Sequence, residues 1–252
     1  MKKLIIIGHR GAMGHAPENT GASFEAGRRL GADAVECDVQ FSRDRRLVVI
    51  HDDILDRTTD GRGPVARKIW AELKTLDAGG WFGHKFAGER LWRLEDLLRW
   101  AKVQRSAAGT PLQVIVEIKN KKSSSVRMAP GVVSAVKRAG MVRRSFVISF
   151  HHGEVARVKR LCPTLRSGLL FSAPLRDLLQ RMRRTRADAI FPRFHLVTKA
   201  LMEEARRRGW FVGTWTVNTP GDLRRAAALG VQAIASNYPE RLLRILGGLP
   251  RR

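Results

Sequence analysis

The first strand of this chain and the turn after it set the fold: Leu4-Ile-Ile-Ile-Gly-His-Arg-Gly11. Four consecutive apolar residues predict a strand that is buried on both faces, as in a parallel sheet. The strand runs directly into a polar turn, which in an α/β protein is where binding and catalytic groups gather. His9 can transfer a proton near neutral pH, Arg10 suits a phosphate, and Gly11 lets a ligand approach closely. We therefore expect a functional site at this strand end.

The length and composition indicate one large folded domain. The chain has 252 residues, of which 44% are hydrophobic, so it can bury a substantial core. Its two cysteines, Cys37 and Cys162, do not suggest a disulfide framework or a zinc site, and Cys37 is expected in the core. The apolar run before Gly8 is too short for a signal peptide or a membrane span. We therefore expect a cytoplasmic protein.

The charge of the chain is strongly positive. Lysine and arginine number 47 against 23 acidic residues, a formal net charge of +24. Such a protein attracts anions, acidic membrane surfaces and nucleic acid. The basic residues are scattered in pairs and triplets, most of which fall at expected helix ends or on exposed helix faces, and no recognisable nucleic-acid-binding motif is present. This pattern favours a small anionic substrate over a specific nucleic acid and leaves transient contact with an anionic membrane surface open.

Strands alternate with helices along the chain. The expected strands are residues 4–7, 34–39, 112–119, 146–150, 168–171, 187–191, 210–217 and 231–236. Asn19 or Thr20 can cap the first helix, which Gly31 can end. Eight strands, most of them followed by a helix, predict an α/β protein of the (β/α)8 TIM-barrel type.

An aperiodic segment interrupts this alternation at about residues 53–94. It contains turn signals and a short helix at residues 70–76, and Trp81, Phe82 and Phe86 could form a small apolar cluster of their own. We interpret the segment as an insertion that follows the second barrel strand and a hairpin.

Two acidic residues lie on the second strand. Glu36 and Asp38 alternate with apolar residues and therefore point to the same side. Burying both is costly without a positive partner, and a divalent cation would supply one. The next apolar run follows too closely for a parallel crossover, so the two runs should form an antiparallel hairpin. With Asp44 and Arg45 at the tip, position 38 lies opposite His51, which brings this histidine beside the acids.

The carboxyl ends of barrel strands meet at one mouth. Seven polar residues are expected there: His9, Arg10, Glu36, Asp38, His51, Glu117 and Lys119. The three carboxylates suit Mg²⁺ or Ca²⁺ better than zinc, and the two histidines can act as general acid and base. The two cations can neutralise a phosphate. Together these groups could cleave a phosphate ester, and the sequence leaves open which histidine is the acid.

The same residues stand in motifs that resemble the glycerophosphodiester phosphodiesterase family. The motifs are His9-Arg10-Gly11, Pro17-Glu18-Asn19-Thr20, Glu36-x-Asp38, His51-Asp52, Arg57-Thr58-Thr59 with Gly61, Leu76-Asp77-Ala78-Gly79 with Trp81-Phe82, Glu117-Ile118-Lys119 and Trp215-Thr216-Val217-Asn218. The resemblance extends from about residue 4 to residue 239. It implies that residues 1–252 form one barrel domain with an insertion. It also implies metal-dependent hydrolysis of a glycerophosphodiester to glycerol 3-phosphate and an alcohol.

The resemblance also implies roles for individual residues. His9 and His51 correspond to the acid and base, and Glu36, Asp38 and Glu117 to ligands of a divalent metal, Mg²⁺ or Ca²⁺. Arg10 corresponds to the phosphate contact, with Lys119 and Trp215 lining the substrate pocket. For Glu18 two roles stay open, orienting Arg10 or a purely structural contact.

The sequence departs from the family pattern at three places, and these leave the leaving alcohol open. Asp44-Arg45 replaces the usual Asp-Gly at the hairpin tip, Trp92-Arg93 replaces Pro-Thr, and Ser236-Asn237 replaces Thr-Asp. One alternative activity is lysophospholipase D-like cleavage of a lysophospholipid, whose acyl chain the aromatic residues of the insertion could contact. Another is non-enzymatic binding of a polyanion. The sequence predicts no oligomeric state.

Overall fold

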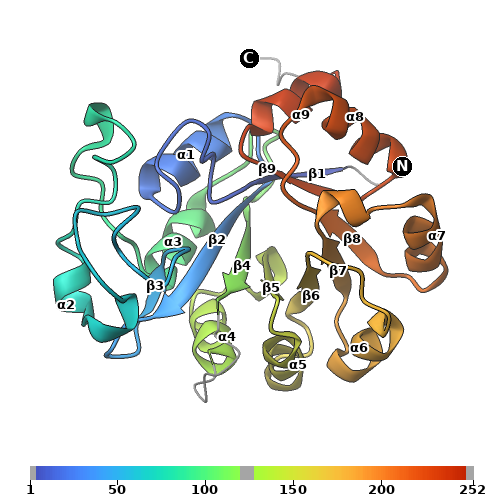
Figure 1. Ribbon diagram of the computed structural model, residues 1–252, viewed down its shortest axis with the longest axis horizontal. Helices are drawn as coiled ribbons and strands as arrows, with labels where there is room; N and C mark the ends of the chain where they lie inside the picture. The colour runs from blue at the N-terminus through green and yellow to red at the C-terminus, as the bar shows by residue number, and fades with distance from the viewer. Residues whose placement is uncertain (1–3, 120–127, 248–252) are drawn as a thin grey trace.

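Eight parallel strands close into a barrel in the computed structural model, which describes residues 4–119 and 128–247 (Figure 1). The strands are β1 (Ile5–Gly8), β2 (Ala34–Phe41), β4 (Gln113–Ile118), β5 (Ser145–Ser149), β6 (Arg166–Phe171), β7 (Ala189–Pro192), β8 (Phe211–Thr214) and β9 (Ala233–Ser236). They pair in the order β1-β9-β8-β7-β6-β5-β4-β2, and the pairing of β1 with β2 closes the ring. The predicted TIM barrel is therefore confirmed, since each expected strand overlaps one of these.

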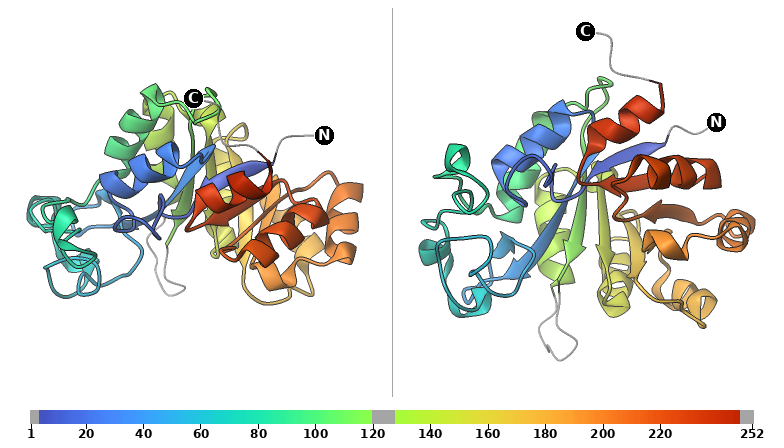
Figure 2. Two further views of the ribbon diagram at one scale, coloured as in Figure 1. Left: turned by 90° about the horizontal axis from the view of Figure 1, so that it is seen from above. Right: turned by 45° about the horizontal axis from the view of Figure 1, so that its top comes forward.

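Helices surround the barrel and bury their apolar stripes against it (Figure 2). They are α1 (Gly21–Arg29), α3 (Leu94–Val103), α4 (Ala129–Arg138), α5 (His152–Leu161), α6 (Leu178–Thr185), α7 (Lys199–Arg207), α8 (Pro220–Leu229) and α9 (Pro239–Ile245). The short helix α2 (Trp70–Leu73) lies apart from them, in the insertion. Thr20 caps α1 by accepting a hydrogen bond from the backbone N–H of Ser23, so the cap falls to Thr20 and leaves Asn19 free for another contact. Both Cys37 and Cys162 are buried and unpaired, in agreement with a core role.

The hairpin after β2 has a register that differs from the expected one. β3 (Leu47–Val49) runs antiparallel to β2 and pairs Val39 with Val49, so position 38 lies opposite 50. The expectation that 38 lies opposite His51 is wrong by one residue. The loop at the tip has three residues, because the backbone N–H of Ser42 donates to the carbonyl of Arg46 at 3.0 Å. Arg45 closes this loop with a left-handed φ of 61°, as three-residue hairpin loops require.

Between β3 and α3 the chain leaves the barrel and packs beside it (Figure 2). Its buried core is mostly aliphatic and includes one residue of β3, Val48. The other members are Ile50, Leu55, Val65, Leu73, Ala78 and Leu91, with Trp70 and Leu76 packed against them. Phe82 contacts both Trp81 and Phe86, with ring centroids 5.5 Å apart in each pair, as the sequence suggested. These three aromatic residues are not part of the buried core, and Trp81 is 41% exposed.

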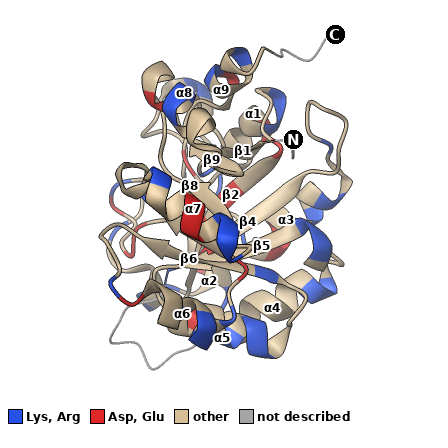
Figure 3. Ribbon diagram, turned by 90° about the vertical axis from the view of Figure 1, so that its right-hand side faces the viewer, with Lys and Arg blue, Asp and Glu red and all other residues tan. Residues whose placement is uncertain are grey.

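Many of the basic residues lie on the outer helices (Figure 3). Basic pairs occupy the last turns of α1, α4, α5, α6 and α7, where a positive charge interacts favourably with the helix dipole. Arg224 and Arg225 lie exposed within α8, so these groups agree with the expectation that most sit at helix ends or on exposed helix faces. Within residues 4–119 and 128–247, no helix has the length and apolar character needed to cross a membrane.

Candidate active site

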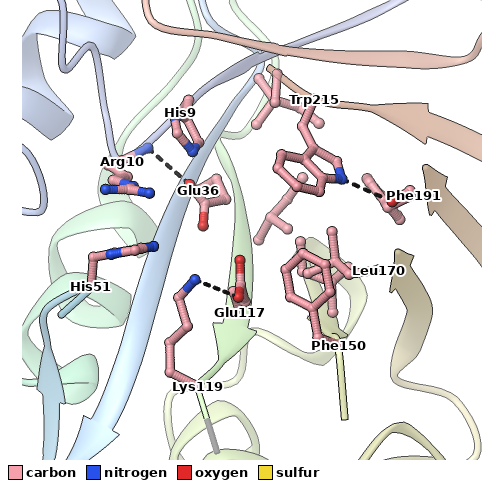
Figure 4. A pocket seen from close by; sticks show the side chains of 14 residues that line it. His9, Arg10, Glu36, His51, Glu117, Lys119, Phe150, Leu170, Phe191 and Trp215 are labelled. Atoms are coloured by element: carbon pink, nitrogen blue, oxygen red, sulfur yellow. Dashed lines mark hydrogen bonds and ion pairs between the residues drawn. The ribbon is translucent and has the colours of Figure 1, made fainter. Parts of the chain in front are cut away.

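The carboxyl ends of the barrel strands enclose a cavity of about 240 Å³ (Figure 4). One wall is polar and is formed by His9, Arg10, Glu36, His51, Glu117 and Lys119. The opposite wall is apolar and includes Phe150, Leu170, Phe191 and Trp215. Every site residue expected from the sequence except Asp38 lines this cavity, and Asp38 lies directly behind the side chains of Arg10 and Lys119.

Three buried carboxylates meet at the polar wall. Glu36 and Asp38 come from β2 and Glu117 from the adjacent β4, where the sheet register pairs Asp38 with Glu117. The three are at most 8% exposed, and one oxygen from each lies within 4.8 Å of the others. Strand alternation puts Glu36 and Asp38 on the inner face, and the neighbouring strand supplies the third acid at the same level.

The protonation of these carboxylates reflects how unevenly their charges are compensated. Burial, together with the charges of Asp38 and Glu117, raises the pKa of Glu36 well above its usual range. Burial and the charge of Asp38 raise the pKa of Glu117 to about 7. For Asp38, the charges of Lys119 and Arg10 outweigh burial and lower its pKa. Three ionised carboxylates would carry more negative charge than Arg10 and Lys119 can neutralise, which is why, beyond the effect of burial, the pKa values of Glu36 and Glu117 are raised. A divalent cation would supply the missing positive charge, and the donors are all hard oxygen atoms, as such an ion prefers.

Asp38 is the most heavily paired of the three acids. Its two oxygens lie 3.2 Å from Nζ of Lys119 and 3.2 Å from Nε of Arg10. The amide of Asn19 also donates to Asp38 at 2.9 Å and accepts from its backbone N–H at 3.2 Å. From the sequence, Asn19 could be assigned only a capping role, because the turn that points it at Asp38 is not visible in a hydrophobic pattern. Its left-handed φ of 61° belongs to that turn.

Arg10 and Lys119 are held at the cavity by carboxylates. Nζ of Lys119 lies 2.6 Å from Glu117 Oε1, and the backbone N–H of Arg10 donates to Glu36 Oε2 at 2.9 Å. The guanidinium of Arg10 donates to Glu18 Oε1 at 2.7 Å. Glu18 is therefore in direct contact with Arg10, one of the two arrangements that the sequence left open. Both side chains also line the cavity, where a phosphate could bind.

Each histidine is oriented through its Nδ1 atom. His9 Nδ1 lies 2.8 Å from Asn237 Oδ1, and His51 Nδ1 lies 2.6 Å from Asp52 Oδ1. A proton on Nδ1 leaves Nε2 as the nitrogen that can accept or donate a proton in the cavity. Burial and the charge of Arg10 lower the pKa of His9 to about 4, and burial also lowers the pKa of His51.

Residues near the chain's carboxyl-terminal end support His9 and the apolar wall. Asn218, the last residue of the Trp-Thr-Val-Asn motif, accepts from the backbone N–H of Asn237 at 2.9 Å. Trp215 donates its indole N–H to the backbone carbonyl of Phe191 at 2.9 Å, which fixes the ring against the cavity. From the sequence, Asn237 stands out only as a departure from the family's usual Thr-Asp. Its contact with His9 depends on the pairing of β9 with β1 in the closed barrel.

The chain matches known proteins over nearly its whole length. A model of the "Glycerophosphoryl diester phosphodiesterase family" matches residues 9–241. A glycerophosphodiester phosphodiesterase from Caldanaerobacter subterraneus subsp. tengcongensis is 35% identical over 248 residues, covering 97% of this chain and 98% of that protein. Another, from Bacillus altitudinis, is 31% identical over 246 residues and covers 95% and 97%, respectively.

Solved structures show the same relationship. A glycerophosphodiester phosphodiesterase from Agrobacterium tumefaciens superimposes with a TM-score of 0.80 at 29% identity, covering 97% of this chain and 100% of that one. An Oleispira antarctica phosphodiesterase, solved in complex with the product sn-glycerol-3-phosphate, has a TM-score of 0.84 at 25% identity and covers 97% of both chains.

Proposed function

This chain belongs to the glycerophosphoryl diester phosphodiesterase family and is an enzyme of that kind, and on that premise we propose how its own residues carry out the hydrolysis. The substrate is a glycerophosphodiester, and the products are glycerol 3-phosphate and an alcohol. The observation that carries the proposal is one cavity into which two oriented histidines, two cations and a buried acidic cluster converge. We further propose that residues 1–252, insertion included, act as a single phosphodiesterase domain.

Arg10 and Lys119 bind the phosphate of the substrate in this proposal. Their ion pairs with Glu18, Asp38 and Glu117 hold both side chains at the polar wall before substrate arrives. A site organised in advance loses little side-chain entropy when it binds and needs little rearrangement as charge develops. Trp215 closes the opposite side of the cavity and limits how the rest of the substrate can lie.

Glu36, Asp38 and Glu117 would hold a divalent cation, Mg²⁺ or Ca²⁺, in this proposal. When bound, it would neutralise charge on the phosphoryl oxygens. The residues fit such an ion because three buried carboxylates stand within 4.8 Å of one another and two of them have raised pKa values.

His9 and His51 transfer the protons. One takes a proton from the attacking oxygen through Nε2, and the other gives a proton to the departing alcohol oxygen. Asn237 and Asp52 keep the two rings in orientations that present Nε2 to the cavity. The apolar wall formed by Phe150, Leu170, Phe191 and Trp215 limits the access of water to the reacting groups.

A second substrate class is a lysophospholipid, and one observation favours it. A groove of about 450 Å³ adjoins the cavity and shares His51, Glu117, Lys119 and Phe150 with it. Two exposed apolar side chains, Ile54 and Phe150, line this groove. The aromatic residues of the insertion, which under this alternative could contact an acyl chain, do not line either space in the part of the chain described.

The test is a substrate panel scored by release of glycerol 3-phosphate or lysophosphatidate. Purified protein is treated with a chelator and then given Mg²⁺ or Ca²⁺ with glycerophosphocholine, glycerophosphoethanolamine or lysophosphatidylcholine. We expect chelation to abolish hydrolysis, either added cation to restore it, and water-soluble diesters to be cleaved. Full activity after chelation would contradict the three-carboxylate site, and cleavage of the lysophospholipid alone would put the alternative substrate first.

A further inference from the structure

We propose that Arg57 is a positioning residue. Its guanidinium group holds Arg10, the phosphate contact, and His51 in fixed positions relative to each other. The inference rests on the proposed roles of Arg10 and His51 and assigns to the insertion a part in the reaction. Arg57 lies outside the cavity, so it acts through Glu18 and Asp52 rather than on the substrate.

All three nitrogens of the Arg57 guanidinium are engaged by carboxylates. Nε donates to Asp52 Oδ2 at 2.6 Å, while Nη1 and Nη2 donate to the two oxygens of Glu18 at 2.8 and 2.9 Å. The pair with Glu18 is a bidentate fork, which fixes direction as well as distance. One planar group thereby sets the relative positions of two acids that come from different segments of the chain.

Each of these acids then contacts a residue of the cavity. Asp52 uses its other oxygen, Oδ1, to bind His51 Nδ1 at 2.6 Å. Glu18 Oε1 accepts from Arg10 Nη1 at 2.7 Å. The path Arg10–Glu18–Arg57–Asp52–His51 therefore joins the phosphate contact to one of the two proton-transferring groups.

Charge and burial explain why Arg57 is needed. Glu18 is only 5% exposed, and its low pKa results from hydrogen bonds and charges of Arg57 and Arg10 that outweigh the cost of burial. The hydrogen bond from Arg57 is also the largest cause that lowers the pKa of Asp52, to about 2. Without Arg57, the buried carboxylate of Glu18 would keep only Arg10 as a paired cation, and Asp52 would lose the contact that holds it toward His51.

The insertion supplies a firm base for Arg57. The backbone N–H groups of Thr58 and Thr59 both donate to the carbonyl of Leu55, as does the hydroxyl of Thr59, which forms a tight turn around position 57. Leu55 is fully buried in the insertion's apolar core. Packing of the insertion thus places the guanidinium, and the insertion contributes to the site without lining the cavity.

The first experiment compares steady-state kinetics of wild type, Arg57→Ala, Arg57→Lys and Asp52→Asn on glycerophosphocholine with saturating Mg²⁺. Arg57→Ala should lower kcat/KM about 10–100-fold, by analogy with the loss of a residue that orients a metal-binding histidine. The KM of this variant should rise because Arg10 is held less firmly, and its kcat should fall because His51 is also less well oriented. Asp52→Asn should lower kcat with little change in KM, because Glu18 still holds Arg10. Arg57→Lys should recover only part of the activity, since an ammonium cannot form the fork.

Arg62→Ala is the matched control. Arg62 lies in the same segment, is 83% exposed and only approaches Asp56 at 3.8 Å, so its loss should leave kcat and KM unchanged. Added guanidinium ion should restore part of the activity of Arg57→Ala and none of the activity lost in Asp52→Asn. The Tm of each variant shows whether activity is lost because Arg10 and His51 are misplaced or because the protein unfolds.

A double-mutant cycle separates this inference from the proposed function. If Arg57 acts through His51, then Arg57→Ala should cost much less kcat in a His51→Ala background than in wild type. The positioning role would be overturned if Arg57→Ala lowered kcat equally in both backgrounds, guanidinium restored no activity, and Arg57→Ala and Asp52→Asn had the same effects on KM and kcat. The proposed function would still stand in that case. Unimpaired turnover by His51→Ala itself would overturn the catalytic assignment and this inference together.

Discussion

Replacing Glu117 by Gln should stabilise the protein when it holds no divalent cation. Glu117 is buried beside Asp38 and Glu36, and burial and the charge of Asp38 raise its pKa from 4.5 to about 7. Each pKa unit corresponds to about 1.4 kcal/mol, so ionising Glu117 in the folded, metal-free protein costs roughly 3 kcal/mol. Gln has nearly the same shape, and its amide oxygen can still accept from Lys119 without adding a negative charge.

The sign of the effect depends on pH. The unfolded carboxyl ionises near 4.5 and the folded one near 7, so the unfolded state binds fewer protons between these values. Wild-type stability therefore falls as pH rises through this window and is flat above it. The gain in the Glu117→Gln variant should be almost nothing at pH 4.5 and roughly 3 kcal/mol at pH 8, which is roughly 6–12 °C in Tm for a chain of this size.

The assay is thermal unfolding of chelated wild type and Glu117→Gln at several pH values from 4.5 to 8, repeated with Mg²⁺ or Ca²⁺. Added cation should stabilise wild type and stabilise the variant much less, because one charged oxygen ligand is gone. Glu95→Gln on α3 is the control, since Glu95 lies outside the acidic cluster and pairs with Arg138 at the surface. A chelated Glu117→Gln protein no more stable than wild type at pH 8 would refute the reasoning.

Two further predictions concern the catalytic groups and the net charge. His9→Ala and His51→Ala should each keep the fold and lower kcat about 10²–10⁴-fold, and near-wild-type turnover in either would contradict its assignment as acid or base. Raising the salt concentration should reduce kcat/KM only modestly, because screening weakens attraction of a small anion. A polyanion binder that neutralises 6–10 phosphates would instead lose roughly 10³–10⁵ in DNA affinity between 50 and 200 mM salt. A paired titration of hydrolysis and DNA binding distinguishes the two, and tight DNA binding at physiological salt without hydrolysis would favour the polyanion binder.

The barrel could be predicted from the sequence because its signals are local and repeated. Each strand is a short apolar run between turn residues, and each helix has an apolar stripe; in α3 the buried residues Leu94, Leu97, Leu98 and Ala101 follow helical spacing. Chain length and strand number then leave few ways to bury all these faces. The mouth residues follow from the same logic, since a parallel barrel brings every strand's carboxyl end to one side.

The insertion was predictable only in outline. Its short helix, α2, is correctly placed but ends at Leu73, because residues 74–76 turn back toward the aliphatic core. Aromatic residues suggested a core of their own, yet the buried positions are filled mainly by Leu, Val and Ile from distant parts of the segment. Such packing depends on contacts between residues far apart in sequence, and no periodic pattern encodes it.

The hairpin of β2 and β3 shows why the residues that line a site can be predicted even when the exact register between strands cannot. The register was expected to place residue 38 opposite 51, and the left-handed turn at Arg45 shifts it by one. His51 nevertheless lines the cavity, because β3 returns the chain to the level of Asp38, whose carbonyl accepts from the backbone N–H of Ile50 at 3.0 Å. Convergence at the mouth is a property of the topology and tolerates a shift of one residue. The pairing of Arg57 with Glu18 and Asp52 tolerates no such shift. Its three hydrogen bonds, at 2.6–2.9 Å, form only when all three side chains are in one relative arrangement. The order of the strands thus predicts which residues gather at the site, whereas the hydrogen bonds of Arg57 to Glu18 and Asp52 become visible only in the folded chain.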